Sequence, residues 1–237
     1  MKWNWAARVA TPAMLVLALS GCGGEAPQAQ ASTASAEAEP PLPPVVGAEQ
    51  RIVALGDSLF AGYGLAPGQS YPARLETALR ARGINARIMN AGVSGDTTAG
   101  GLQRLDFTLN SLPAPPALVI ISLGGNDMLR GLSPDETRAN LDAILGKLKA
   151  RKVPVLLLGM LAAPNMGADY AGRFNPIYPA LAGKYDAQLV PFFLQALAGK
   201  PNLVQADHIH PTAEGVDRMV EESIGDAIIA LPLPGKH

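Results

Sequence analysis

Four polar side chains in three short segments are suited to acyl-transfer chemistry. Ser58 and Asn126 each follow a short apolar run, and Asp207 and His210 lie three residues apart near the C-terminus. A serine hydroxyl becomes an effective nucleophile when an imidazole removes its proton and a carboxylate orients that imidazole. The oxyanion that forms needs fixed donors, such as an asparagine amide. These residues therefore predict a serine hydrolase with Ser58 as its nucleophile.

The choice of general base lies between two imidazoles. The chain has three histidines, and one of them is the terminal His237. The other two, His208 and His210, share a segment with Asp207. One turn can bring Asp207 and His210 to the same side, whereas adjacent side chains diverge in an extended segment. We therefore predict His210 as the base, Asp207 as its orienting carboxylate and His208 as a solvated residue at the rim.

The same segment suggests a metal site as an alternative. Asp207, His208 and His210 are three potential ligands, but the chain offers neither a further internal histidine nor a cysteine beyond Cys22 to complete a zinc site. We predict no metal and no cofactor. A dinucleotide enzyme is disfavoured because no G-x-G-x-x-G follows the first apolar run, and an α/β-hydrolase proper is disfavoured because no G-x-S-x-G occurs.

Four apolar runs predict the strands that position these residues. They lie at residues 51–55, 84–90, 117–123 and 153–158, and glycine follows each of them closely. Such continuous apolar runs are typical of parallel strands covered on both faces. In an open sheet of this kind ligands bind outside the carboxyl ends of the strands. We therefore expect the small polar turns after the first three runs to meet at one edge.

Helical patterns separate the apolar runs. Helices are expected over residues 72–82 and 98–109, and from Ser133, where Ser133 and Glu136 form a capping box. Apolar residues at helical spacing near the C-terminus predict a last helix. The alternation predicts an α/β fold: a three-layer α/β/α sandwich with a mostly parallel, doubly wound, flavodoxin-like sheet.

Four blocks of sequence together resemble the GDSL (SGNH) hydrolase family. They are residues 56–59, which read Gly-Asp-Ser-Leu, and residues 94–97, 124–127 and 207–211. The resemblance extends from about residue 51 to residue 231. Residues 90–97, 163–167 and 177–179 are similar in particular to the bacterial arylesterase, thioesterase I and lysophospholipase L1 branch, in which residues 163–167 would line the acyl site.

The resemblance implies a role for each matching residue. It implies the fold of SGNH hydrolases, a catalytic triad of Ser58, His210 and Asp207, and an oxyanion hole made by Ser58, Gly95 and Asn126. The implied reaction is hydrolysis of aryl or alkyl carboxylic esters through an acyl-enzyme. Acyl-CoA thioesters and lysophospholipids are further candidate substrates.

Two departures and two alternatives accompany this interpretation. His208 stands where the branch often has glycine, and residues 161–163 are smaller than in the thioesterase I type, so an acyl preference does not transfer. One alternative is a carbohydrate O-acetylesterase of the same superfamily. The other is a non-catalytic, ligand-binding lipoprotein.

The N-terminal residues predict export and lipid anchoring. Residues 1–22 combine basic residues, a short apolar run and the sequence Leu-Ser-Gly-Cys, which looks like a bacterial lipobox with Cys22 as the lipidated residue. Residues 23–48 are rich in Ala, Pro, Ser and Gln and predict a disordered tether, followed by the hydrolase domain at residues 49–237. We expect the protein on the outer membrane, facing the periplasm.

Composition limits the partners. The formal net charge of the chain is -1, and nucleic-acid binding needs a basic face. We therefore predict no nucleic-acid partner. The expected partners are a small acyl ester or thioester substrate and the membrane that holds the lipid on Cys22.

Overall fold

The structure is a computed structural model that describes residues 44–233. The predicted signal segment, the lipidation site Cys22, most of the predicted tether and His237 lie outside the described residues. No helix within residues 44–233 is long and apolar enough to cross a membrane.

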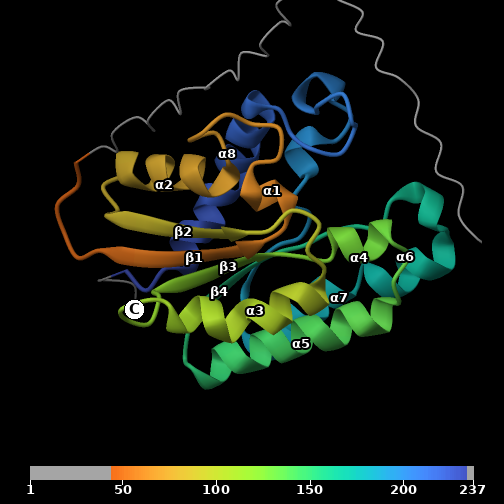
Figure 1. The fold of residues 1–237 in the computed structure, drawn as a ribbon, viewed down its shortest axis with the longest axis horizontal. Coiled ribbons are helices and arrows are strands. Elements are labelled where there is room, and N and C mark those ends of the chain that lie inside the picture. The colour runs from red at the N-terminus through yellow and green to blue at the C-terminus, as the bar shows by residue number, and fades with distance from the viewer. Residues whose placement is uncertain (1–43, 234–237) are drawn as a thin grey trace, which may run out of the picture. The chain divides into compact units, whose positions relative to one another are not determined.

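A parallel sheet of five strands forms the middle layer (Figure 1). Its strands are β1 (Gln50–Gly56), β2 (Ala86–Gly92), β3 (Leu118–Ser122), β4 (Val155–Leu158) and β5 (Gln188–Val190). They lie in the order β2-β1-β3-β4-β5, and each neighbouring pair is parallel. The chain therefore winds outward in both directions from β1 and β3, and this switch point is where such sheets bind ligands.

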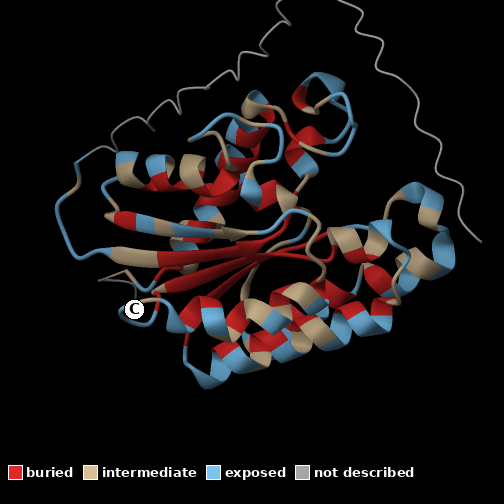
Figure 2. Cartoon of the chain, viewed as in Figure 1, coloured by how far each residue is buried: buried red, intermediate tan, exposed pale blue. Residues whose placement is uncertain are grey.

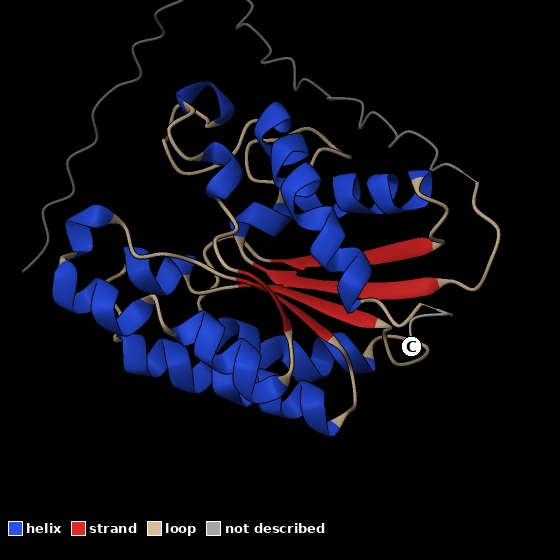
Figure 3. Ribbon diagram, turned by 180° about the vertical axis from the view of Figure 1, so that it is seen from behind, coloured by secondary structure: helices blue, strands red, loops and turns tan. Residues whose placement is uncertain are grey.

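Helices cover both faces of the sheet (Figures 1 and 3). One face carries α1 (Ser58–Ala61), α2 (Tyr71–Ala81) and α8 (Ala213–Ala230). The other carries α3 (Thr98–Asn110), α5 (Pro134–Ala150) and α7 (Ile177–Tyr185). Two short helices, α4 (Gly125–Leu129) and α6 (Ala168–Phe174), and three single 3₁₀ turns complete the described elements. The predicted three-layer, doubly wound fold is confirmed.

The core lies along the inner strands (Figure 2). Every residue of β3 and β4 is buried, as are the last five of β1. The edge strand β2 is mostly half-buried or exposed, so the prediction that both faces of every strand are covered is wrong there. β5 was not predicted from the sequence, because this edge strand is only three residues long and begins with a glutamine.

Side-chain caps fix the points where the long helices leave the sheet edge. Thr97 accepts a hydrogen bond from the N–H of Gly100 at the start of α3, and Thr212 accepts one from Gly215 at the start of α8. Ser133 caps α5 by accepting from the N–H of Asp135, one residue earlier than the predicted capping box. These caps hold the loops before the helices, which include the polar turns.

The carboxyl ends of the first three strands meet at one edge, as predicted. Gly56, the last residue of β1, pairs with Gly92 of β2 on one side and Ser122 of β3 on the other. The segments that carry Ser58, Gly95 and Asn126 therefore leave the sheet at the same level.

Candidate active site

Ser58, His210 and Asp207 form a continuous hydrogen-bonded chain. The Nε2 atom of His210 lies 2.8 Å from Ser58 Oγ, and its Nδ1 atom lies 2.7 Å from Asp207 Oδ2. The other carboxylate oxygen of Asp207 accepts from the backbone N–H groups of Ile209 and His210, at 3.0 Å each. The tight turn predicted for residues 207–210 therefore does bring the carboxylate to the imidazole. The hydrogen bond from His210 and those backbone bonds hold the pKa of Asp207 well below its usual range.

The position of Ser58 is set by the cap of α1. Asp57, the N-cap residue, accepts from the N–H of Leu59 at 3.0 Å, so Ser58 itself is the first helical residue and not the cap. Because Ser58 begins the helix, its own N–H has no partner within α1. Gly56 is required just before this turn, since a Cβ there would lie 2.5 Å from the ring of Phe60.

Asp57 is a buried carboxyl group beside the candidate nucleophile. Its side chain is 3% exposed. Burial raises its pKa to about 6 from the ordinary 3.8, although the N–H of Leu59 and the nearby His210 oppose that rise. Its hydrogen bond from the N–H of Leu59 fixes the turn that carries Ser58.

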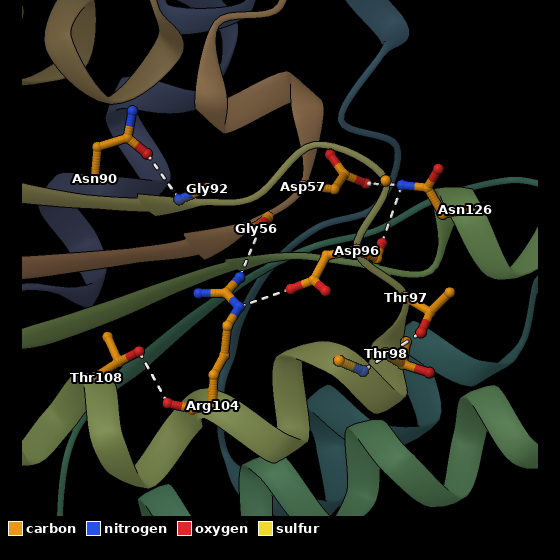
Figure 4. A network of polar contacts seen from close by, with 12 residues as sticks. Gly56, Asp57, Asn90, Gly92, Asp96, Thr97, Thr98, Arg104, Thr108 and Asn126 are labelled. Atoms are coloured by element: carbon orange, nitrogen blue, oxygen red, sulfur yellow. Dashed lines mark hydrogen bonds and ion pairs between the residues drawn. The ribbon is translucent and has the colours of Figure 1, made fainter.

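The loop after β2 is held firmly against the end of β1 (Figure 4). Arg104 of α3 donates to the Asp96 carboxylate at 2.6 Å and to the carbonyl of Gly56 at 2.8 Å. Gly95 has a left-handed φ of 82°, and its carbonyl accepts from Arg130 at 2.6 Å. These contacts from α3 and Arg130 fix the backbone of Gly95 beside Ser58.

Asn126 is placed by a glycine and a buried tyrosine. Gly124 precedes α4 with a φ of 105°, and a Cβ there would lie 2.2 Å from the hydroxyl oxygen of Tyr178. That hydroxyl donates to the carbonyl of Leu123 at 2.9 Å. Residues 177–179 stood out in the sequence only through the family resemblance, and the structure shows that Tyr178 supports the turn that carries Asn126.

Both donor directions of the Asn126 amide are engaged (Figure 4). Its Nδ2 atom lies 3.0 Å from the carbonyl oxygen of Asp96 and 3.3 Å from Asp57 Oδ2. Asn126 therefore bridges the loop after β2 and the cap of α1, and it lines the same cleft as Ser58.

Asp127 of α4 is a buried carboxylate whose side chain is 1% exposed. It accepts from the N–H and hydroxyl of Thr98, and from the hydroxyl of Thr137 at 3.3 Å. Asp127 thus joins the start of α3, 29 residues away in the chain, to the start of α5.

Ser58, Gly95, Asn126 and His210 line one cleft of about 660 Å³, with Asp207 behind the imidazole. Most of the remaining lining is apolar, including Met128, Met160, Leu161, Phe192 and Leu194. Two methionines, Met128 and Met160, thus line the cleft. Of the predicted lining loop at residues 163–167, the cleft includes Ala163 and Pro164.

His208 lies at the rim of the cleft, as expected. It is exposed and has a left-handed φ of 59°. Within the described part of the chain, no group of three or more His, Cys, Asp or Glu side chains is arranged to hold a metal ion.

Two further residues lie beside the imidazole of His210, and neither was predicted from the sequence. The ring centroids of Tyr63 and His210 lie 4.5 Å apart. The amide nitrogen of Gln205 donates to the carbonyls of Tyr63 and Pro211, at 2.8 Å each. The only local signal is that Tyr63 stands between two glycines, and both of them adopt left-handed backbone.

A parallel α/β sandwich with a serine–imidazole–carboxylate chain at the carboxyl edge of its sheet is the arrangement of a hydrolase that acts by acyl transfer. The chain belongs to the GDSL-like lipase/acylhydrolase family, whose model matches residues 54–218, and it is a carboxylic ester hydrolase. The family predicted from the four blocks is thereby confirmed.

Known proteins of this family resemble the chain over most of its described length. Esterase TesA of Pseudomonas aeruginosa is 42% identical, over 73% of this chain and 86% of that protein. Thioesterase 1/protease 1/lysophospholipase L1 of Escherichia coli is 38% identical, over 70% and 78%. The crystal structure of AlinE4, a SGNH-hydrolase family esterase, is 61% identical with a TM-score of 0.67, over 79% of this chain and all of that one.

Proposed function

We propose that the chain hydrolyses carboxylic esters through an acyl-enzyme, with Ser58 as nucleophile, His210 as general base and acid, and Asp207 as the orienting carboxylate. The unbroken hydrogen-bonded chain from Ser58 Oγ to Asp207, at 2.8 and 2.7 Å, carries this proposal. Because the serine end of that chain opens on the cleft, an ester carbonyl bound there can approach the hydroxyl.

In the first step, Ser58 Oγ bonds to the ester carbonyl carbon while His210 Nε2 takes the hydroxyl proton. The imidazolium that forms is stabilised by the Asp207 carboxylate at Nδ1. The tetrahedral intermediate then expels the alcohol, and His210 returns its proton to the leaving oxygen. Water attacks the acyl-enzyme by the same route in reverse and releases the acid.

Three donors are proposed for the oxyanion: the N–H groups of Ser58 and Gly95 and the amide of Asn126. The fixed backbone of Gly95 and the start of α1 at Ser58 support the first two. One N–H of Asn126 stays on the carbonyl of Asp96, at 3.0 Å. The other is held only at 3.3 Å by Asp57, and we propose that it turns to the oxyanion when substrate binds.

The lining of the cleft favours esters with apolar acyl or aryl groups. Four of its residues, Tyr63, Leu129, Leu161 and Ile209, are large apolar side chains exposed at the mouth by 42 to 56%. Burial of apolar substrate surface contributes about 25 cal/mol per Å². The name of one relative, thioesterase 1/protease 1/lysophospholipase L1, makes thioesters and lysophospholipids further candidates, and the sequence resemblance points to acyl-CoA among the thioesters. An O-acetyl sugar would bury hydroxyl groups against these side chains at a cost.

A panel of p-nitrophenyl esters, acyl-CoA thioesters and acetylated sugars tests this assignment. We expect turnover of the aryl esters, with kcat/KM rising as the acyl chain lengthens from acetate until the cleft is filled. Turnover of acetylated sugars alone would support the carbohydrate esterase alternative. No turnover of any ester, with binding of an apolar ligand retained, would favour the ligand-binding lipoprotein.

We also propose that the protein is exported and held on the outer membrane, facing the periplasm, by lipid on Cys22. The Leu-Ser-Gly-Cys segment and the short apolar run before it support this location. Stable anchoring needs more than one acyl chain, which a lipoprotein N-terminus carries. The tether would let the cleft reach substrates close to the membrane.

A further inference from the structure

We propose that Gln205 and Tyr63 form a clamp that positions His210 for catalysis, and that the Tyr63 ring also stabilises the imidazolium. This inference rests on the proposed function, because it assumes that His210 is the base. Both residues act on the imidazole and are therefore positioning residues, distinct from the groups that exchange protons with substrate.

The imidazole is held by a turn with little apolar support. Residues 206–209, which include Asp207, are all exposed. Segments with few buried apolar contacts open readily. Polar contacts and ring contacts must therefore supply the precision that keeps His210 Nε2 within 2.8 Å of Ser58 Oγ.

Gln205 ties this turn to the segment after the nucleophile helix. Its amide nitrogen donates to the carbonyl of Tyr63 and to the carbonyl of Pro211, each at 2.8 Å. Its backbone N–H donates to the carbonyl of His210 at 2.8 Å. One side chain thus joins the backbone on the serine side of the cleft to the backbone immediately after the base.

Gly64 makes room for that amide. It has a left-handed φ of 72°, and a Cβ at this position would lie 2.3 Å from Oε1 of Gln205. Any larger residue would displace the Gln205 side chain. The glycine next to Tyr63 is therefore part of the same device.

Tyr63 places an aromatic ring beside the imidazole. The two ring centroids are 4.5 Å apart, and the planes are tilted by 34°. A cation within about 6 Å of an aromatic centroid is attracted to the ring. His210 becomes a cation whenever it holds the Ser58 proton, so this attraction is strongest in the transition states and not in the resting enzyme.

The clamp is tested first with Gln205→Met, which keeps the length of the side chain and removes its N–H donors. We expect kcat on p-nitrophenyl acetate to fall by about ten- to a hundredfold, since small misplacements cost that much. KM should stay within about twofold of the wild-type value, because Gln205 is not among the residues that line the cleft. Inactivation by an aryl phosphonate should slow in parallel. Gln103→Met, on the exposed side of α3, is the matched control.

The aromatic contribution is tested by comparing Tyr63→Phe with Tyr63→Leu. Leucine keeps apolar contact but removes the π face, so kcat should fall by about three- to thirtyfold. Phenylalanine should restore most of that loss. Phe107→Leu, an exposed aromatic on α3, controls for a general effect of the change. A change in KM alone would mean that Tyr63 only contacts substrate, and it would overturn this part of the proposal.

Folding and the proposed function are checked separately. Each variant is compared by thermal unfolding, and Gly64→Ala, which displaces Gln205 without altering it, should reproduce the kcat loss of Gln205→Met. Unchanged kcat and unchanged phosphonate inactivation in folded Gln205→Met would overturn the clamp. If Ser58→Ala stays active, the proposed function fails instead; if Ser58→Ala is inactive and the clamp variants are unaffected, only the clamp fails.

Discussion

The amide nitrogen of Asn126 lies 3.3 Å from the carboxylate of Asp57, the residue immediately before Ser58. The same amide donates to the carbonyl of Asp96 at 3.0 Å. Three segments that leave three neighbouring strands are therefore joined by one side chain. Any substitution of Asn126 or Asp57 therefore disturbs both the proposed oxyanion donor and the turn that carries Ser58.

Asn126→Ala should lower kcat by about 10²–10³, which is the usual cost of losing one oxyanion donor. The KM value should change much less, since the donor acts mostly in the transition state. Steady-state kinetics on one aryl ester measure both values. Asn202→Ala, at an exposed position in the 3₁₀ turn Pro201–Leu203, is the matched control. A variant changed in KM alone would show that Asn126 binds substrate instead.

Asp57→Asn should remove a pH dependence of stability. Burial raises the pKa of Asp57 to about 6, so between the ordinary 3.8 and about 6 the folded state holds a proton that the unfolded state has lost. The contribution of Asp57 to the free energy of unfolding is therefore full below pH ~4 and is lost as the pH rises through about 6. We expect the stability of the variant relative to wild type to increase over this window by about 1–3 kcal/mol.

Urea unfolding of both proteins at several pH values from 4 to 8 measures this difference. The pKa of Asp207 is lowered in the folded protein, so its contribution to the free energy of unfolding is present above pH ~4 and is lost as the pH falls below that value. This contribution is the same in both proteins and cancels in the comparison. Equal pH dependence in the two proteins would contradict the assignment. In the wild type, Oδ2 of Asp57 accepts a hydrogen bond from the amide of Asn126. An asparagine at position 57 places an N–H group there instead of an acceptor, which disturbs Asn126, so kcat of the variant should also fall.

Ser58→Ala should fold normally and lose nearly all esterase activity. The hydroxyl makes one hydrogen bond, to His210, and is not the cap of α1, so its removal leaves the turn intact. A serine-directed phosphonate should label Ser58 in the wild type, as read by peptide mass spectrometry. Ser111→Ala, which changes an exposed serine after α3, is the control: it should be as active as wild type and should still be labelled at Ser58. Labelling at another serine would refute the nucleophile assignment.

His210→Ala should lower kcat/KM by several orders of magnitude, whereas the neighbouring His208→Ala should cost little. Only the imidazole of His210 lies between Ser58 and Asp207, while His208 is exposed at the rim. Both purified variants are assayed on one aryl ester after circular dichroism confirms folding. The reverse order of activities would overturn the choice of base. Loss of activity in both, with recovery on adding zinc, would revive the metal alternative.

Cys22→Ser should move the protein from the membrane fraction to the soluble fraction. Lipid on this cysteine is the proposed anchor, and serine cannot carry the thioether. Fractionation followed by an esterase assay and mass spectrometry of the N-terminus measures the change. A wild-type protein that is already soluble, with its N-terminus at another residue, would refute lipid anchoring.

The parts of the fold with strong periodic patterns were predictable from sequence. β1, β3 and β4 are buried apolar runs, and α5 begins with a serine cap and proline. The edge strand β5 and the short helices α1 and α4 were not predicted, because tertiary contacts stabilise them and their sequences have no periodic apolar pattern. The same holds for the site. The spacing of Asp207 and His210 indicated their pairing, but nothing local indicates that Gln205 reaches the carbonyl of Tyr63.

Ser58 and His210 are separated by 152 positions in the chain. During synthesis Ser58, Gly95 and Asn126 are all made long before His210, whose imidazole is proposed to activate the serine. Under the proposed mechanism the nascent chain holds Ser58 without its base, and hydrolysis can begin only after the segment that carries His210 has packed. Recovery of esterase activity in a refolding experiment should consequently coincide with the last folding phase.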